Sequence, residues 1–256
     1  MDVRPGGPRR YELKYTIPEQ LARAIRDHIQ PLFSPDPHAT ADDGRYVVNS
    51  LYLDTPGLRF YYDTKFRKLT RLKLRVRYYG TYPDRQLFLE AKHRHDTVLW
   101  KRRRPIPAAQ WPGVLQVARS EQTPPTIVDM PETFEELTHL YAAAPVLRVR
   151  YSREAYVSDT DEYGRITFDR SLRYRLAPGS TEIEGSDEDM VGFDDPVTAQ
   201  WDDSPVILEI KTQTFVPSWA IAIIRRFSLV QRGFSKYCYA IDRYLEDGRS
   251  VDELAL

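Results

Sequence analysis

Cysteine is almost absent from this sequence, since Cys238 is the only one in 256 residues. A single thiol excludes a disulfide framework and a cysteine-rich zinc site, and it fits a reducing compartment. No uninterrupted apolar run approaches the ~20 residues that a membrane-spanning helix requires. The opening stretch MDVRPGGPRRYELKY has no apolar centre, so we expect no signal peptide. These absences predict a soluble, cytoplasmic protein without a transmembrane segment.

Histidine is also scarce, and the five histidines do not have the spacing of a metal site. His93 and His95 would share one face of a strand, but no acid or thiol is spaced to complete a ligand set. We therefore expect these two side chains to face solvent. Cys238 lies among aromatic residues at helical spacing, which predicts a core position rather than a nucleophile.

Net charge is zero, but the charges are distributed unevenly along the chain. Residues 65–104 hold fourteen Lys or Arg against three acids, whereas residues 180–203 hold nine acids and no base. A strongly positive region favours a polyanionic ligand. We predict residues 178–204 as a long acidic loop and residues 1–8 as disordered.

Alternating apolar and polar residues predict a mainly β chain of the α+β class. The expected strands are 9–15, 45–54, 71–79, 86–94, 97–104, 146–157, 164–170 and 205–212. The expected helices are 18–30, 131–143, 217–231 and one that begins near residue 235. Asp54, in YLDTPG, has the position of a turn residue. We find no repeat and no clear boundary, so we expect one domain over residues 1–256.

The predicted strands carry charge of one sign on one face. In RLKLRVR, Arg71, Lys73, Arg75 and Arg77 alternate with leucine and valine, so they share a surface. Half-buried strands with a solvated charged face would also produce alternation. However, like charges at every second position repel one another and favour a bound anion.

Isolated glutamates accompany these bases on the same predicted faces: Glu12, Glu90 and Glu209. Carboxylates among many bases favour Mg²⁺ or Mn²⁺ together with phosphates, because these ions take few protein carboxylates and complete their shell with substrate oxygens. Eight strands can close into a barrel wide enough for a small ligand. With the charged faces inward, the interior would be an anion-binding tunnel.

The ordered series RYELKY, NSLYLDTPG, KLRVRYYG, FLEAKHR, VLWKRR, PVLRVRYSREAY, RITFD, VILEIKT and FSKYCYAID resembles the VTC domain over about residues 9 to 244. That family belongs to the triphosphate tunnel metalloenzymes. The resemblance implies a closed eight-stranded antiparallel β-barrel, the triphosphate tunnel fold, with flanking helices. It also implies a polyphosphate polymerase that transfers the terminal phosphate of ATP onto inorganic polyphosphate and releases ADP, with Mn²⁺ or Mg²⁺ as cofactor.

The resemblance also implies roles for individual residues. Glu209 would hold the metal, and Lys236, in FSKY, would contact phosphate near the site of transfer. Strand alternation places Arg150 on the face opposite Arg153. Arg153 fits the motif better, but a bulge would bring Arg150 in instead, so both stay candidates. The full set of phosphate-binding candidates is Lys14, Arg75, Arg77, Lys92, Lys101, Arg150, Arg153 and Arg165.

Three other functions remain open at this point. A metal-dependent triphosphatase or polyphosphatase would use the same bases and metal, with water as the acceptor. A non-catalytic polyphosphate-binding module would need the bases but not a metal-holding carboxylate such as Glu209. An RNA-binding barrel is disfavoured because the cationic strands lack interleaved aromatics for base stacking, so we expect no nucleic-acid partner. The sequence does not identify a protein partner.

Overall fold

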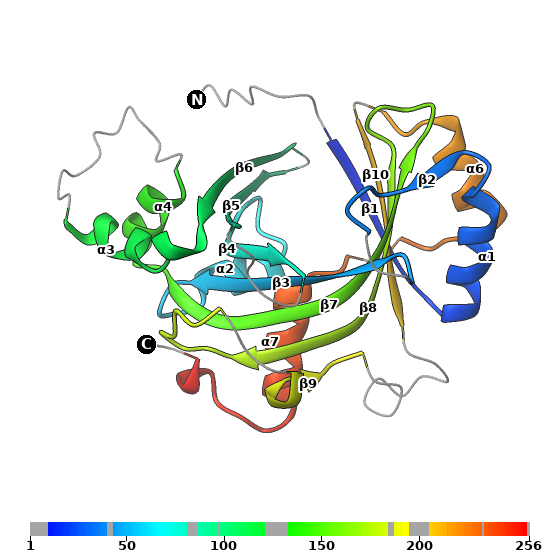
Figure 1. Ribbon diagram of the computed structural model, residues 1–256. Coiled ribbons are helices and arrows are strands. Elements are labelled where there is room, and N and C mark those ends of the chain that lie inside the picture. The colour runs from blue at the N-terminus through cyan, green and yellow to red at the C-terminus, as the bar shows by residue number, and fades with distance from the viewer. Residues whose placement is uncertain are drawn as a thin grey trace. The chain divides into compact units, whose positions relative to one another are not determined.

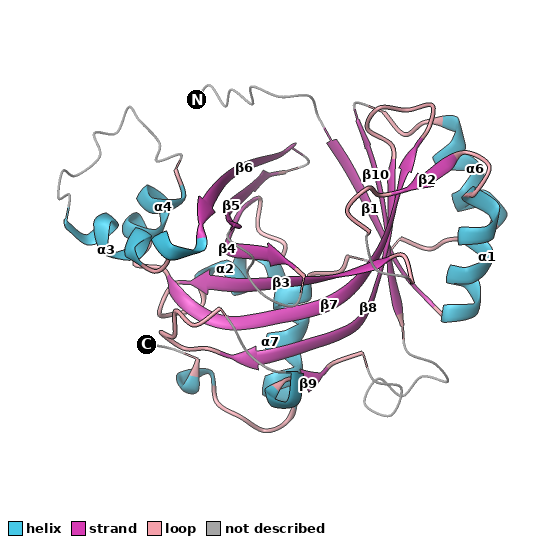
Figure 2. Cartoon of the chain, in the orientation of Figure 1, coloured by secondary structure: helices cyan, strands magenta, loops and turns pink. Residues whose placement is uncertain are grey.

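The computed structural model describes residues 10–39, 43–80, 86–96, 98–120, 133–183, 187–194, 205–213, 215–231 and 233–254. More of these residues lie in strands than in helices, and the strands pair antiparallel (Figure 1; Figure 2). The mainly β class predicted from alternation is therefore confirmed.

All eight predicted strands are present. Their bounds are β1 (Arg10–Ile17), β3 (Arg45–Asp54), β4 (Thr70–Tyr79), β5 (Gln86–His95), β6 (Val98–Pro107), β7 (Ala144–Ser158), β8 (Arg165–Leu176) and β10 (Val206–Gln213). Two short strands, β2 (Phe33–Pro35) and β9 (Val191–Gly192), were not predicted. They pair with β7 and β8, and two or three residues are too few for alternation to be recognised.

The strands are hydrogen-bonded in the order β1-β10-β8-β7-β3-β4-β5-β6. β1 and β6 stand at the two ends, and no described residue of one pairs with the other. The predicted closure into an eight-stranded barrel is therefore wrong, and the sheet is open. The sequence of β6 gives a reason: its consecutive bases 101–104 are followed by Pro105 and Pro107. Charges and prolines are typical of an edge strand that accepts no further partner.

The chain forms two compact units, and β3, β7 and β8 contribute residues to both. Unit 1 comprises Met1–Val47, Tyr151–Arg173 and Gly192–Ser235. Unit 2 comprises Val48–Arg150, Tyr174–Val191 and Lys236–Leu256. Each unit has its own hydrophobic core.

In unit 1, two helices pack against β1, β8 and β10: α1 (Glu19–Ile29) and α6 (Ser218–Arg226) (Figure 1). α1 follows Pro18, whose fixed φ suits the start of a helix. Ala22, Ile25 and Ile29 recur at intervals of three and four residues, so they share the buried face of the helix.

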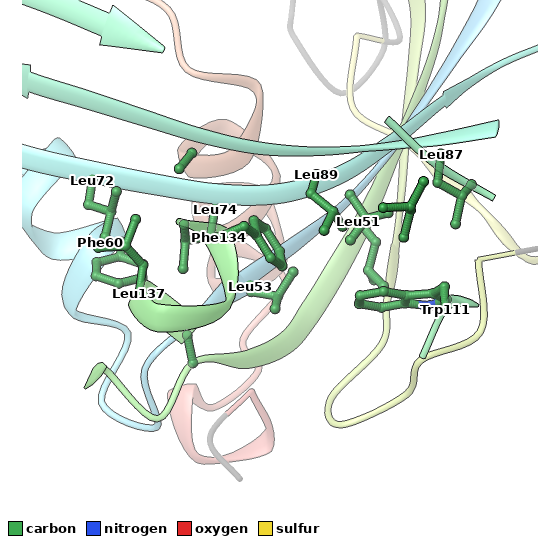
Figure 3. Packing of buried hydrophobic residues seen from close by; sticks show 14 of the residues in the cluster. Leu51, Leu53, Phe60, Leu72, Leu74, Leu87, Leu89, Trp111, Phe134 and Leu137 are labelled. Carbon is green, nitrogen blue, oxygen red and sulfur yellow. The ribbon is translucent and has the colours of Figure 1, made fainter. Parts of the chain in front are cut away.

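In unit 2, the core lies between the apolar side of β3–β5 and the helices α2 (Arg59–Lys65) and α4 (Phe134–Leu140). Figure 3 shows Leu53, Leu74 and Leu89 in the same cluster as Phe60 and Phe134. A capping box formed by Thr133 and Glu136 fixes the start of α4. The described part of unit 2 also contains the α-helices α3 (Gly113–Ser120) and α7 (Lys236–Glu246).

The helices predicted at 18–30 and from about 235 are confirmed as α1 and α7. The 131–143 prediction contains α4 but runs past its end at Leu140, where Ala142 adopts a left-handed φ of 47°, and residues 131–132 lie outside the described residues. The 217–231 prediction is too long, because α6 ends at Arg226 and Ser228 adopts a left-handed φ of 49° that stops the helix. α2 and α3 were not predicted.

Residues 178–204 are not all loop. Their described part contains a short 3₁₀ turn, Asp187–Asp189, and strand β9. The predicted disorder of residues 1–8 lies outside the described residues. No helix in the described ranges is long and apolar enough to cross a membrane.

Cys238 is buried in α7, as predicted. His93 and His95 are half-buried rather than exposed. The ring of His93 stacks on Trp100 at 5.1 Å between centroids, and His95 Nδ1 lies 2.8 Å from Thr70 Oγ1. These neighbours on the adjacent strands cover part of each ring.

Candidate functional site

Basic side chains gather on one face of β4, β5 and β6 in unit 2. Across β4 and β5, Lys73 pairs with Lys92 and Arg75 pairs with Glu90, and β6 extends the face with Lys101 opposite Lys92. The leucines and valine that alternate with these bases are buried in the core. We call this surface the basic face; it comprises Lys73, Arg75, Arg77, Lys92, Lys101 and Arg103, with Glu90 among them.

Glu90 is the acidic centre of the basic face, and only 1% of its side chain is exposed. Its Oε2 accepts a hydrogen bond of 2.6 Å from Arg75, and its Oε1 accepts one from Lys101. Arg103 Nε lies 3.4 Å from Oε1, and Arg77 Nε lies 4.0 Å from Oε2. Among the described residues, one carboxylate therefore faces four cations, so positive charge predominates on this surface.

Burial and neighbouring charges shift the pKa values of two groups in this cluster. Burial opposes the ionisation of Glu90, but Arg75, Arg77 and Lys101 hold the pKa of its carboxyl well below the usual value. Burial lowers the pKa of Lys101 to about 7. The charges of Arg75 and Arg77 also lower it, whereas the charge of Glu90 raises it. Glu90 is thus fixed as an anion, whereas Lys101 titrates near neutral pH.

Replacing Glu90 by glutamine is expected to lower the free energy of unfolding by about 3 kcal/mol, near the lower end of the range for breaking a buried ion pair. Arg77, which is buried, would keep its charge without the carboxylate of Glu90. Lys101 and Arg103 reach solvent and would relax, which limits the loss. Urea unfolding at pH 7 measures this difference.

The matched control is Glu246→Gln, which removes a carboxylate of unit 2 that is 64% exposed and pairs with Arg243. Exposed ion pairs contribute only about 0–1 kcal/mol, so the control should unfold almost as the wild type does. A Glu90→Gln protein as stable as this control would show that Glu90 is not needed to hold the basic face together.

Lys236 is the first residue of α7, and a buried hydrogen-bond network fixes that end of the helix within unit 2. Tyr237 donates its hydroxyl to Asp54 Oδ2 at 2.6 Å, and its ring stacks on Tyr52 at 5.0 Å between centroids. Asp54 is 1% exposed. It also accepts hydrogen bonds from the backbone N–H groups of Thr55, Phe60 and Tyr61. Asp54 is therefore more than a turn residue, because it joins β3 to α2 and to α7.

The same network reaches the basic face through Tyr52. Arg75 donates a hydrogen bond of 3.1 Å to the Tyr52 hydroxyl, and its guanidinium lies 5.8 Å from the centre of the Tyr52 ring. Tyr52 thus has Arg75 at its hydroxyl and Tyr237 against its ring. This arrangement connects the start of α7 to the basic face through direct contacts.

A second charged cluster lies on β1, β10, β8 and β7 in unit 1. Lys14 Nζ lies 2.8 Å from Glu209 Oε1, and Lys211 Nζ lies 2.9 Å from Glu209 Oε2. Arg153 reaches Glu209 at 3.8 Å and donates two hydrogen bonds to Asp169, at 2.6 and 2.7 Å. We call these five residues the carboxylate cluster. With three cations and two buried carboxylates, it is far closer to neutral than the basic face.

The sequence matches a family model described as the VTC domain over residues 9–244, a range that contains both clusters. The chain belongs to the VTC domain family. A comparison with curated proteins finds no match.

Two solved structures are similar to this VTC domain. One is a "putative adenylate cyclase" from Bacillus halodurans, which is 10% identical, with coverage of 88% of this chain and 92% of that one and a TM-score of 0.48. The other is a protein of Pyrococcus horikoshii OT3, which is 13% identical, with coverage of 94% and 99% and a TM-score of 0.43.

In this VTC domain, the residues predicted for phosphate binding are divided between the two units. Arg75, Arg77, Lys92 and Lys101 lie together on the basic face, and Lys14 and Arg153 lie together around Glu209. Lys236 belongs to unit 2 and is 8% exposed.

The other two candidates are Arg165 and Arg150. Arg165 is exposed, opposite Lys211, at the end of the polar face of β8 and β10. Arg150 is half-buried in the part of β7 that belongs to unit 2. Of the two arginines that strand alternation left open, Arg153 is the one that contacts Glu209.

Sequence reasoning missed four residues of the site: Arg103, Asp169 and Lys211, which belong to these clusters, and Tyr52, which contacts Arg75. Alternation carries a signal for three of them. Arg103 shares a strand face with Lys101, Lys211 shares one with Glu209, and Asp169 lies two positions from Thr167, which pairs with Glu209. Nothing in the sequence around Tyr52 distinguishes it from a core tyrosine.

Clustered oxygen ligands for a divalent metal are few in the part of this VTC domain that the structure describes. The described residues contain no group of three or more His, Cys, Asp or Glu side chains that could hold an ion. Thr167, however, lies directly opposite Glu209, and its Oγ1 is shielded from solvent and has no hydrogen-bond partner in the described ranges. A carboxylate and a hydroxyl fit an ion such as Mg²⁺ or Mn²⁺ that takes its other ligands from phosphates and water.

Proposed function

We propose that this VTC domain is a polyphosphate polymerase that transfers the γ-phosphate of ATP onto a polyphosphate chain and releases ADP. The observation that carries the proposal is the basic face, where four cations surround one buried glutamate. Such an excess is unfavourable in the free protein and is relieved by a polyanion. Membership of the VTC domain family adds support for phosphate chemistry.

The arrangement of side chains suits phosphoryl transfer, which needs positioning and charge neutralisation more than covalent help from the protein. Arg75 and Arg77 present guanidinium forks that match phosphate oxygens, while Lys101 acts as a mobile point charge. Lys236, held at the start of α7 by Tyr237 and Asp54, would neutralise the charge that develops on the transferring phosphate.

Glu209, with Thr167 opposite, would hold a Mn²⁺ or Mg²⁺ ion. The bound ion would supply charge neutralisation on the phosphate oxygens. Lys14 and Lys211 each form an ion pair with one carboxylate oxygen of Glu209. When the ion binds these oxygens, the two lysines would pair with the phosphates instead.

A metal-dependent triphosphatase or polyphosphatase would use the same residues with water as acceptor. The two activities are separated by incubating the protein with ATP and Mn²⁺ or Mg²⁺, and then following ADP, free phosphate and polymer together. ADP with a ladder of polymer and little free phosphate supports the polymerase. Free phosphate in step with ADP, without polymer, makes the protein a hydrolase. Tight polyphosphate binding without turnover leaves a binding module.

Polyphosphate affinity is expected to fall as the pH rises above about 7, because free Lys101 loses its proton there while a bound polyanion favours the charged form. Binding then takes up a proton, and the affinity falls by at most about tenfold per pH unit. Below pH 7 Lys101 is already charged, so its contribution becomes constant. Titrations of polyphosphate binding between pH 6 and 9 measure the slope.

The control is Lys101→Arg, which keeps its charge throughout this range. Because the terminal phosphates of the ligand also titrate, the decisive quantity is the difference between the two proteins at each pH. The wild type should lose affinity more steeply than the variant above pH 7. Parallel slopes would rule out Lys101 as the titrating group.

A further inference from the structure

The cationic surface of unit 2 continues beyond the basic face. Arg71 lies two residues before Lys73 in β4, on the same face of the strand, and it pairs directly with Arg94 of β5. Successive same-face positions on a strand are about 7 Å apart. A ligand held by Arg75 must therefore extend about 14 Å along β4 before it reaches Arg71.

This arginine pair differs from the basic face in its lack of a carboxylate. Glu90 balances Arg75, but within the described residues no acid forms an ion pair with Arg71 or Arg94. Directly opposed like charges on neighbouring strands destabilise a sheet. The pair therefore favours an anion that the protein itself does not supply.

The geometry of Arg71 agrees with this. Its Nε is shielded from solvent and has no hydrogen-bond partner among the described residues. Burial lowers the pKa of the Arg71 guanidinium, and the charges of Arg94 and Arg67 lower it further. Arg94 uses its Nε to bond the backbone oxygen of Asp96, which fixes the side chain beside Arg71. A shielded N–H donor is thus held next to a second, oriented guanidinium.

We propose that Arg71 and Arg94 form a separate phosphate subsite that binds the distal part of a linear polyphosphate chain. The inference rests on the proposed function, because it requires that polyphosphate binds the basic face. Triphosphate held at Arg75 and Arg77 is too short to reach this pair, whereas a long chain spans both. The subsite therefore makes affinity depend on chain length.

The test compares tripolyphosphate with long-chain polyphosphate as ligands of the full chain and of the double variant Arg71→Gln/Arg94→Gln. Two charge-assisted contacts are lost, so the long chain should bind about tenfold or more weakly. The negative slope of log affinity against log salt concentration should become smaller in magnitude by about one to two. Tripolyphosphate affinity should not change, and this also reports that the variant is folded.

The matched control is Arg102→Gln/Arg104→Gln, which removes the same charge from exposed positions on the opposite side of β6. An equal loss in the control, or an equal loss for both ligands, means a general charge effect and overturns the subsite. Unchanged long-chain affinity in the double variant overturns it as well. If the wild type binds neither ligand, the proposed function itself fails, and this outcome is distinct from the other two.

Discussion

Replacement of Lys236 by alanine is expected to lower kcat about 100- to 1,000-fold, the usual effect of removing one group that stabilises charge in the transition state. The side chain is 8% exposed at the first turn of α7, where Tyr237 and Asp54 fix the backbone. The loss should appear in kcat more than in KM, because a charge that acts mainly in the transition state contributes little to ground-state binding. Initial rates of ADP release with ATP and polyphosphate measure it.

Lys68→Ala is a suitable control for this experiment. It removes one lysine of unit 2 that is 60% exposed and pairs with Asp63 rather than with Glu90. Its rate should stay close to that of the wild type. Thermal unfolding of both variants separates a loss of chemistry from a loss of fold. A Lys236→Ala enzyme that is folded and retains a near wild-type kcat would remove Lys236 from the catalytic assignment.

The second large effect is expected for Glu209→Gln, which keeps the size of the side chain but removes the charge that would hold the metal. Turnover should fall about 100-fold or more. The Mn²⁺ concentration needed for half-maximal activity should also rise, because an amide is a poorer ligand for a hard cation than a carboxylate. Metal titrations of the ATP-dependent activity measure both quantities.

Loss of Glu209 also leaves Lys14 and Lys211 without this carboxylate, so binding must be measured beside activity. Without metal, the variant should bind tripolyphosphate at least as tightly as the wild type, since one negative charge is gone. Glu162→Gln, which removes an exposed acid of unit 1, is the control and should change neither quantity. Full activity and an unchanged metal requirement in Glu209→Gln would exclude the metal role.

Alternation predicted the strands well because each is buried on one side only. β4 is the clearest example: Leu72, Leu74 and Val76 lie in the core while Lys73 and Arg75 point the other way. Alternation also placed Arg75 and Arg77 on one face of a strand, whereas Lys101 was a candidate only through the resemblance to the VTC domain. What it lacks is the order of strands in space, so it gave no evidence on whether β1 and β6 meet.

Other features depend on contacts that sequence patterns do not carry. α2 is only seven residues long and follows Leu58 in a left-handed conformation, which apolar periodicity does not reveal. The division of the candidate residues between two units is equally hidden, because each unit is assembled from three separate segments. The role of Asp54 depends on a hydroxyl that is remote in sequence, so its local motif indicates only a turn.

The bond between Tyr237 and Asp54 also bears on how this protein is made. It joins residues 183 positions apart, and the neighbouring bond from Tyr61 to Asp242 spans 181 positions. During synthesis, β3, α2 and the whole basic face therefore leave the ribosome long before α7 does. Contacts between residues so far apart in sequence form late in folding. Until α7 has been made, the nascent chain exposes the Tyr52 ring and the Asp54 carboxylate, both of which contact Tyr237 of α7 in the folded protein. Incompletely synthesised chains should consequently depend on chaperones, and translation must proceed to α7 before Lys236 has a fixed position.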